Sequence, residues 1–197
     1  SEDGWLNAWV DFNRDGKFDP ASEAIATAEF LPAGSTILSF VVPKIEDVDP
    51  HSVVYSRFRF SSNTRLLGPA GVRADGELPN GEVEDYAYLN GDFDGDLDRD
   101  INDVDIMTKA IKNGEAGQTD LNCDGMTDQE DLTLLIEEIF GTYRGDADLD
   151  GDVDFTDFLQ VSSSFGKKDA SWADGDFDAD CEVSFADFLY VSTNFGK

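Results

Sequence analysis

The chain has 197 residues and a formal net charge of −29 at pH 7, because it carries 43 acidic side chains and only 14 basic ones. A surface this negative excludes nucleic acid and anionic membranes as partners, since both are bound through basic patches. With 40% apolar residues the chain is not a disordered acidic tail, and it contains no run of about 18 apolar residues that would span a membrane.

The length is sufficient for one large domain or for two to three small ones. The chain opens at Ser1 on a charged, strand-like segment, without a visible signal peptide. We therefore expect a fragment of a longer protein.

Residues 1–90 carry the pattern of β-strands. Segments rich in aromatic and β-branched residues, several of them alternating with polar residues, predict strands over residues 5–12, 36–42, 53–60 and 82–89. Short strands at regular spacing are typical of an antiparallel β-sandwich, which is the fold we expect for this part.

Two pairs of side chains in these strands have two interpretations each. We expect Trp5 and Trp9 to pack in the core or at the sheet edge, whereas an exposed aromatic face would indicate carbohydrate binding. We expect Arg57 and Arg59 to form salt bridges with acidic residues of the sheet; the alternative is a clamp for a carboxylate ligand.

An acidic loop follows the first predicted strand. Asp11, Asn13 and Asp15 place oxygen-bearing side chains at alternating positions, as at the start of a calcium loop, and Glu23 supplies a closing carboxylate. The sequence therefore predicts a calcium site here. The alternative is an Asx-rich turn that is capped by its own side chains.

Four further acidic segments, 94–105, 120–131, 146–157 and 176–187, hold 22 of the 43 acidic residues. Each places oxygen-bearing side chains at its positions 1, 3, 5 and 12, which is the ligand spacing of an EF-hand-type calcium loop. Four matches in one chain predict four Ca²⁺ sites. The expected ligands, with the residue at position 7 supplying its backbone carbonyl, are Asp94, Asp96, Asp98, Asp100 and Asp105; Asp120, Asn122, Asp124, Met126 and Asp131; Asp146, Asp148, Asp150, Asp152 and Asp157; and Asp176, Asp178, Asp180, Glu182 and Asp187.

The first of these segments also fits a second register, which starts at Asp92. In the register from Asp94, Arg99 stands at position 6, where the sharp turn favours glycine. Gly125 and Gly151 meet this demand in the second and third segments. We therefore expect the second and third segments to bind calcium more tightly than the first.

A single helix follows each acidic segment. Apolar periodicity predicts helices over residues 106–111, 132–140, 158–165 and 188–195, and none directly before the last three segments. Residues 155–167 recur at 185–197, an offset of 30 residues. Because one loop and one helix cannot bury an apolar face alone, we expect the segments to pair into two modules. The predicted domains are residues 1–90, 91–143 and 144–197.

Two aromatic residues at matched positions of the last module, Phe155 and Phe185, have two interpretations. In one, they pack on each other and close the core of the module. In the other, they form an exposed apolar patch for a partner, beside Gln160 and Tyr190.

The sequence argues against catalysis. His51 is the only histidine, which excludes a histidine-based zinc site and a Ser-His-Asp triad. The paired carboxylates stand at metal-binding spacing rather than at the spacing of a glycosidase pair. Cys123 and Cys181 form no metal or redox motif; they are either two loop residues or a disulfide pair.

A calcium loop with an exiting helix, present twice per module and closed by Asp rather than Glu, resembles the type I dockerin. The likeness is greater for residues 146–197 than for residues 91–142. It implies a secreted bacterial protein and a cohesin-like partner bound through the exiting helices, on two pseudo-symmetric faces. Weak multi-carboxylate sites are useful only where calcium is millimolar, so we expect an extracellular location.

Residues 1–90 resemble the GEVED domain of large secreted bacterial proteins. The resemblance lies in AWVDFNRDG at residues 8–16, RFRF at residues 57–60 and GEVEDY at residues 81–86. It implies a β-rich fold and an extracellular setting but no particular activity. Two alternatives to partner binding stay open: a rigid stalk whose modules dock within the chain, and a carbohydrate-binding role for residues 1–90.

Overall fold

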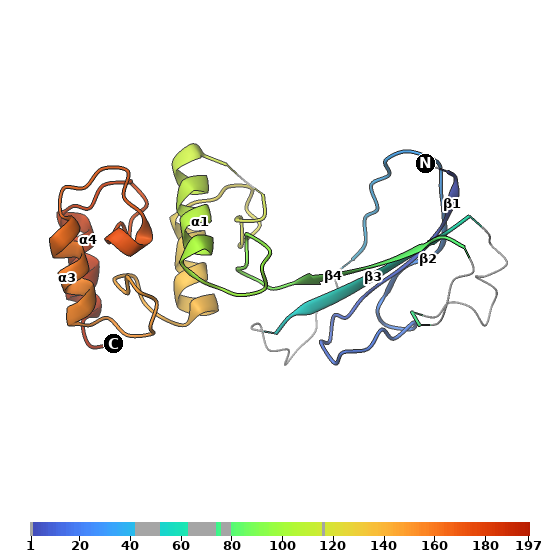
Figure 1. Cartoon of the computed structure of the whole chain (residues 1–197), viewed down its shortest axis with the longest axis horizontal. Coiled ribbons are helices and arrows are strands. Elements are labelled where there is room, and N and C mark those ends of the chain that lie inside the picture. Colours follow the sequence, from blue (N-terminus) through green and yellow to red (C-terminus); the bar gives the residue numbers. More distant parts are fainter. Residues whose placement is uncertain (1, 42–51, 63–73, 76–79, 116) are drawn as a thin grey trace. The chain divides into compact units, whose positions relative to one another are not determined.

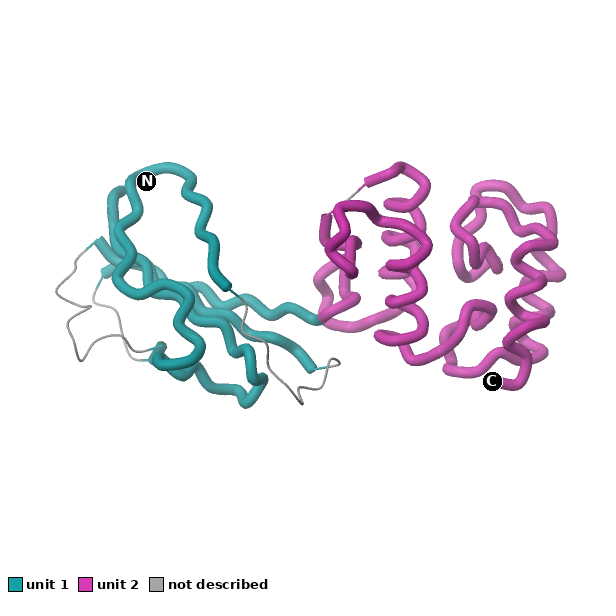
Figure 2. The backbone as a smooth tube through the Cα atoms, turned by 180° about the vertical axis from the view of Figure 1, so that it is seen from behind, with its two compact units in different colours: residues 1–89 teal, residues 90–197 magenta. Residues whose placement is uncertain are grey.

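The chain forms two compact units, residues 1–89 and residues 90–197, shown in teal and magenta in Figure 2. The computed structural model describes residues 2–41, 52–62, 74–75, 80–115 and 117–197. His51 and the last residue of the predicted strand at 36–42 lie outside the described residues.

The N-terminal unit is built on a four-stranded antiparallel sheet (Figure 1). Its strands are β1 (Gly4–Val10), β2 (Ala24–Leu31), β3 (Val54–Ser61) and β4 (Glu82–Tyr88), in the order β2-β1-β3-β4. Antiparallel strands were expected and are present. A second sheet, which a sandwich needs, is not found among the described residues of this unit.

One predicted strand is wrong and one strand was missed. Residues 36–41 have no regular structure, and the side chain of Ile37 is 94% exposed. The strand that pairs with β1 here is β2, whose sequence AIATAEFL contains three alanines and a glutamate, which are depleted in strands. The pairing of β1 with β2 is irregular near Ala8, and Asn7 Oδ1 accepts a hydrogen bond from the Ala28 backbone N–H at 2.8 Å. Tertiary pairing therefore outweighs local preference here.

Two of the three sequence motifs of this unit, RFRF and GEVEDY, pair in the sheet. Arg57 on β3 lies opposite Asp85 on β4, and its guanidinium donates to both carboxylate oxygens at 2.6 Å. The hydrogen bond from Arg57 holds the pKa of Asp85 below its usual value. The Arg57 guanidinium also lies 5.3 Å from the centre of the Phe18 ring, which ties the acidic N-terminal loop to the sheet. The expected salt bridge is confirmed for Arg57.

The tryptophans of this unit serve packing. Trp9 is fully buried, and Trp5 packs edge-on against Phe30 with ring centres 5.2 Å apart. Gly81 begins the last motif at φ +98°, and a Cβ there would lie only 2.0 Å from the Phe60 carbonyl oxygen. That position therefore requires glycine.

The second unit contains the four expected helices. They are α1 (Ile101–Asn113), α2 (Gln129–Thr133) with its π-helical continuation η2 (Leu134–Phe140), α3 (Phe155–Ser164) and α4 (Phe185–Asn194). A short 3₁₀ turn, η3 (Trp172–Asp174), precedes α4. Each helix begins earlier than its apolar pattern predicts, because a capping box of two polar side chains starts the first turn.

One hydrophobic core runs through this whole unit. It joins residues of the first two helices, such as Met107 and Leu135, with Val161, Val191 and Trp172 of the second half. None of the helices in the described part of the chain is long and apolar enough to cross a bilayer.

Candidate metal centre

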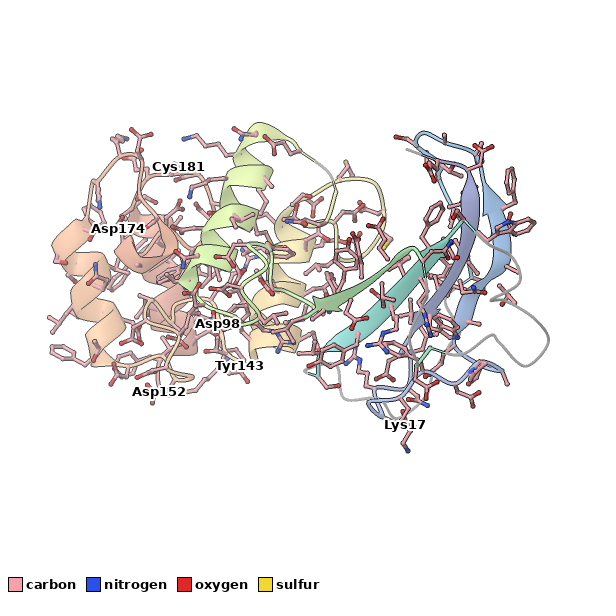
Figure 3. All side chains as sticks on the ribbon, turned by 45° about the vertical axis from the view of Figure 1, so that its right-hand side comes forward. Lys17, Asp98, Tyr143, Asp152, Asp174 and Cys181 are labelled. Carbon is pink, nitrogen blue, oxygen red and sulfur yellow. The ribbon has the colours of Figure 1, made fainter. Side chains whose placement is uncertain are left out.

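Four loops of one design lie before the four helices, and each helix begins at the tenth residue of its loop. We define loop 1 as residues 92–103, loop 2 as residues 120–131, loop 3 as residues 146–157 and loop 4 as residues 176–187. Figure 3 shows the oxygen-bearing side chains that gather at these loops, with Asp98 of loop 1 and Asp152 of loop 3 labelled.

The register of loop 1 that starts at Asp94 is wrong. The structure uses the register from Asp92: the backbone N–H of Leu97 donates to Asp92 Oδ2 at 2.9 Å, just as Gly125 does to Asp120 Oδ2 in loop 2. The closing residue is therefore Asp103, whose Oδ1 accepts from the Phe93 N–H at 2.7 Å. The predicted ligand Asp105 lies outside the loop.

The other predicted ligands of loop 1 remain in the loop but at different positions. Asp94, Asp96 and Asp98 occupy positions 3, 5 and 7, and Asp100 is the N-cap of α1 at position 9. Position 6 is Leu97 and not Arg99, so the strain that was expected at Arg99 does not arise there.

All loops share an unusual backbone path with two left-handed residues, at positions 4 and 6. In loop 3 these are Leu149, at φ +56°, and Gly151, at φ +100°. The same pair of positions is left-handed in the other three loops, at Gly95 and Leu97, Cys123 and Gly125, and Ala179 and Cys181. A backbone that repeats such a costly path four times points to a common requirement for placing the oxygen atoms inside the turn.

The carboxylates at positions 1 and 12 are buried in the protein, except that of Asp120 in loop 2, which is partly exposed. Asp146 and Asp157 of loop 3 are 0% and 1% exposed. Asp157 accepts hydrogen bonds at 2.7 Å from the backbone N–H groups of Ala147 and Asp154, which places it at the closed end of the turn. Asp103, Asp131 and Asp187 accept the equivalent bonds in their loops.

In three of the loops the acidic groups converge. One oxygen each of Asp146, Asp148 and Asp157 lies within 4.8 Å of the others. Loop 4 groups Asp176, Asp178 and Asp187 in the same way, and loop 1 forms two such sets, Asp92 with Asp94 and Asp96, and Asp98 with Asp100 and Asp103. In loop 2 position 3 is an amide, Asn122, beside the carboxylates of Asp120, Asp124 and Asp131.

Convergence and burial oppose ionisation of these groups. Burial raises the pKa values of Asp146 and Asp157 above their usual value. On the exposed side of loop 3, the charge of Asp150 raises the pKa of Asp152. A cation at the centre of the loop would stabilise the ionised form of such a set of carboxylates.

Loop 4 provides a direct test of fit for a metal ion. Asp176 is 1% exposed, and its Oδ2 accepts a hydrogen bond from the Cys181 N–H at 2.9 Å. Its Oδ1 is buried and has no hydrogen-bond partner. Burial raises the pKa of Asp176 to about 7, and the charges of Asp187 and Asp178 act in the same direction. A buried carboxylate oxygen without a donor fits a hard cation that accepts oxygen ligands.

The N-terminal loop follows the same path. Arg14 and Gly16 are left-handed at positions 4 and 6, and the Gly16 N–H donates to Asp11 Oδ2 at 2.9 Å. Glu23, at position 13, is 2% exposed and accepts from the backbone N–H groups of Asn13 and Asp19. The side chains of this loop cap its turn, as in the second sequence interpretation, and the calcium site stays a prediction.

The two cysteines are both free thiols. Cys123 is exposed at position 4 of loop 2, and Cys181 is half-buried at position 6 of loop 4. They are loop residues, and the disulfide alternative is wrong.

Sequence reasoning missed Asp92 and Asp103, although a signal for them was present. The residue at position 16 of every loop-helix unit is buried: Met107, Leu135, Val161 and Val191. Counted from Asp94, position 16 would be the exposed residue Lys109. The acidic residues alone fit both registers of loop 1. The spacing of the buried apolar residues in the helix that follows identifies the register from Asp92.

The register can be tested by two matched substitutions in loop 1. Asp92→Asn removes a position-1 carboxylate and is expected to reduce the number of bound calcium ions by one, because that site loses an anchoring charge. Asp105→Asn is expected to leave the number unchanged. Isothermal titration calorimetry on the full chain counts the ions. If Asp105→Asn lost one bound calcium ion and Asp92→Asn lost none, the register that starts at Asp94 would be correct.

Comparison with known families gives one match. The GEVED domain model matches residues 5–88, which confirms the resemblance of the N-terminal part. Comparisons with curated proteins and with solved structures gave no match. The family match ends before the loops of the second unit, so the likeness of residues 91–197 to dockerins stays a prediction.

Proposed function

We propose that the chain is a non-catalytic, extracellular, calcium-binding fragment whose dockerin-like part attaches it to a cohesin-like protein domain. Loops 1 to 4 hold one Ca²⁺ each. Their position-1 and position-12 carboxylates form the closed end of each site, and the side chains at positions 3 and 5 with the carbonyl at position 7 form the rest. The N-terminal loop, with Asp11, Asn13, Asp15 and Glu23, is a candidate for a fifth ion.

The observation that carries the calcium proposal is the buried, unpartnered Oδ1 of Asp176 in a loop design that occurs four times. A buried carboxylate without compensation is costly. Water or an amide N–H could also meet one oxygen, but three loops with converging carboxylates need positive charge. Calcium suits them because it takes six to eight oxygens in flexible geometry, whereas magnesium demands a near-ideal octahedron.

Calorimetry on metal-stripped protein tests this proposal. We expect four or five Ca²⁺ ions per chain and much weaker binding of Mg²⁺. A chain that binds no calcium, or that binds both ions equally well, would contradict the assignment.

The partner surface in this proposal is formed by α3 and α4, which pack against each other. Four rings make a continuous row across the two helices: Phe155 stacks on Phe158, Phe158 meets Phe188 edge-on, and Phe188 stacks on Phe185. Phe155 and Phe185 are 60% and 63% exposed. The interpretation in which these two residues close the core is therefore wrong.

This surface is uncharged although the chain is highly acidic. The only charged residues of α3 and α4, Asp157 and Asp187, are buried at their loops. Leu159 and Leu189 add exposed apolar area at matched positions, at 51% and 48% exposure. A contiguous apolar patch without charge is a feature of protein-binding surfaces. Because the patch repeats between the two helices, it supports binding in two orientations related by half a turn.

The double variant Phe155→Ser/Phe185→Ser tests the surface. We expect it to abolish capture of the partner while changing the free energy of unfolding by about 1 kcal/mol or less, because both rings are largely exposed. The measurement is pull-down from the extracellular fraction of the source organism, with and without calcium, and identification of the captured protein by mass spectrometry. Thermal unfolding of both proteins gives the stability.

Met126→Ser is a matched control, because Met126 is an apolar residue of the same unit with 58% exposure and the substitution keeps the backbone carbonyl that is its expected ligand in loop 2. It should leave capture intact. If the wild type and the double variant captured the partner equally well, or if capture did not depend on calcium, this surface would not be the partner-binding surface. The runner-up function is a calcium-rigidified stalk without an external partner, which the absence of any calcium-dependent capture would favour.

A further inference from the structure

The second unit has two halves, residues 90–143 with α1 and α2, and residues 144–197 with α3 and α4. The outer faces of the helices that follow the loops can be compared between these two halves. Positions 10 and 14 of each loop-helix unit lie one turn apart on the same helix face. In the second half these positions are exposed and apolar, with Phe155 and Leu159 on α3, and Phe185 and Leu189 on α4. In the first half the same positions are Ile101, Asp105, Gln129 and Thr133, and the last three form hydrogen bonds with the second half of the unit.

On α1 the contact runs through Trp172 of η3. Asp105 Oδ1 accepts a hydrogen bond from the Trp172 backbone N–H at 3.1 Å. The Trp172 side chain is fully buried, and its Nε1–H donates to the Asp146 carbonyl at 2.7 Å. One residue thus links the outer face of α1 to the first position of loop 3.

On α2 the contact runs through Arg144, which is 6% exposed. Its Nη2 donates to the Gln129 carbonyl at 2.7 Å and to Thr133 Oγ1 at 2.9 Å, and its guanidinium lies 5.6 Å from the centre of the Tyr190 ring on α4. Gln129 Nε2 donates in turn to the Asp178 carbonyl of loop 4 at 2.7 Å. The position-10 and position-14 residues of α2 therefore hold the second half.

We propose that the first half of residues 90–197 has its docking face permanently occupied by the second half, so that the unit is one body with a single open docking face, on α3 and α4. The chain then takes one external partner rather than two. That this open face receives a cohesin-like domain rests on the function proposed above; the internal occupation of the first face does not.

The same stacking does not continue to a further copy of the chain. Arg144 and Trp172 stand two residues before loop 3 and four residues before loop 4. The residues at the corresponding places before loops 1 and 2 are Asn90 and Ala116, which offer neither a guanidinium nor an indole. The open face is also apolar where the occupied one is polar. A different protein, with an apolar surface, therefore fits the open face.

Hydroxyl-radical footprinting of the full, calcium-loaded chain tests the proposal. In the wild type we expect Phe155 and Phe185 to be modified readily and Trp172 and Tyr190 to be protected. The double variant Asp105→Ala/Gln129→Ala removes one attachment on each helix. It should raise the modification rates of Trp172 and Tyr190 severalfold and leave those of Phe155 and Phe185 unchanged.

The matched control is Gln118→Ala, which removes a side-chain hydrogen bond to the Phe93 carbonyl within the first half. In this control the modification rates of Trp172 and Tyr190 should equal those in the wild type. Modification of Trp172 in the wild type as fast as that of Phe155 would overturn the proposal, as would a double variant indistinguishable from the control. Absence of a partner for α3 and α4 would contradict the proposed function and leave this protection pattern in place.

Discussion

Chelation of calcium is expected to unfold residues 90–197 while the sheet of residues 1–89 persists. A ligand at 1,000 times its dissociation constant contributes about 4 kcal/mol per site, and a whole domain is stable by only about 5–15 kcal/mol. Loss of several such contributions leaves buried carboxylates such as Asp146, Asp157 and Asp187 without a counter-charge. The folded state of this unit should then no longer be favoured.

Far-UV circular dichroism follows this unit selectively, because the helices of the described residues all lie between residues 101 and 194. The helical signal should fall on addition of EDTA and return with millimolar calcium. Magnesium at the same ionic strength is the control for screening of charge. An unchanged melting curve in EDTA would contradict the prediction, and full rescue by magnesium would show that screening and not coordination holds the unit.

The carboxylate spacing and the helices were predictable because both are local patterns. Alternating oxygen side chains define a metal loop within 12 residues, and the apolar period defines the helix that follows. The error in loop 1 arose because Asp stands at every second position from Asp92 to Asp100. Spacing alone cannot choose between registers in such a run, whereas the buried Met107 can.

The missed strand has a different physical origin. β2 contains Ala24, Ala26 and Ala28, which favour strands weakly, and Ala28 is left-handed at φ +49°. Residues 36–41 have the better strand composition but no partner strand among the described residues. Pairing with β1 decides between them, and the sequence of either segment does not contain that information.

The attachment between the two halves of the second unit was also beyond sequence reasoning. Asp105 was assigned to calcium because its spacing fits, but it contacts Trp172, which lies 67 residues away. Arg144 lies in a short segment without a predicted helix and is buried, and it donates hydrogen bonds to Gln129 and Thr133. Contacts at such separation follow from the packed arrangement of repeats, which a local pattern does not specify.

The calcium-free protein should become more stable as the pH falls from 8 to 5, which is the reverse of the calcium-loaded protein. Burial raises the pKa of Asp176 from 3.8 to about 7 in the folded state. Between these values the folded state binds a proton that the unfolded chain has released. Stability is therefore present at low pH and is lost as the pH rises towards 7, by about 1.4 kcal/mol per pH unit for one such group. With calcium the sign inverts, because protons compete with the metal for the same carboxylates.

The helical far-UV signal at a series of pH values in EDTA, and chemical denaturation at the same pH values in calcium, measure the two pH dependences. The control is Asp176→Asn, which keeps the shape of the side chain and removes its charge. In EDTA at pH 8 this variant should keep more helical signal than the wild type, and its signal should vary less with pH, since a buried amide needs no counter-ion. In calcium it should be less stable, because loop 4 loses a ligand. If Asp176→Asn destabilised the protein in both conditions, the buried Oδ1 would have a role in packing, and its lack of a hydrogen-bond donor would no longer argue for a metal ion.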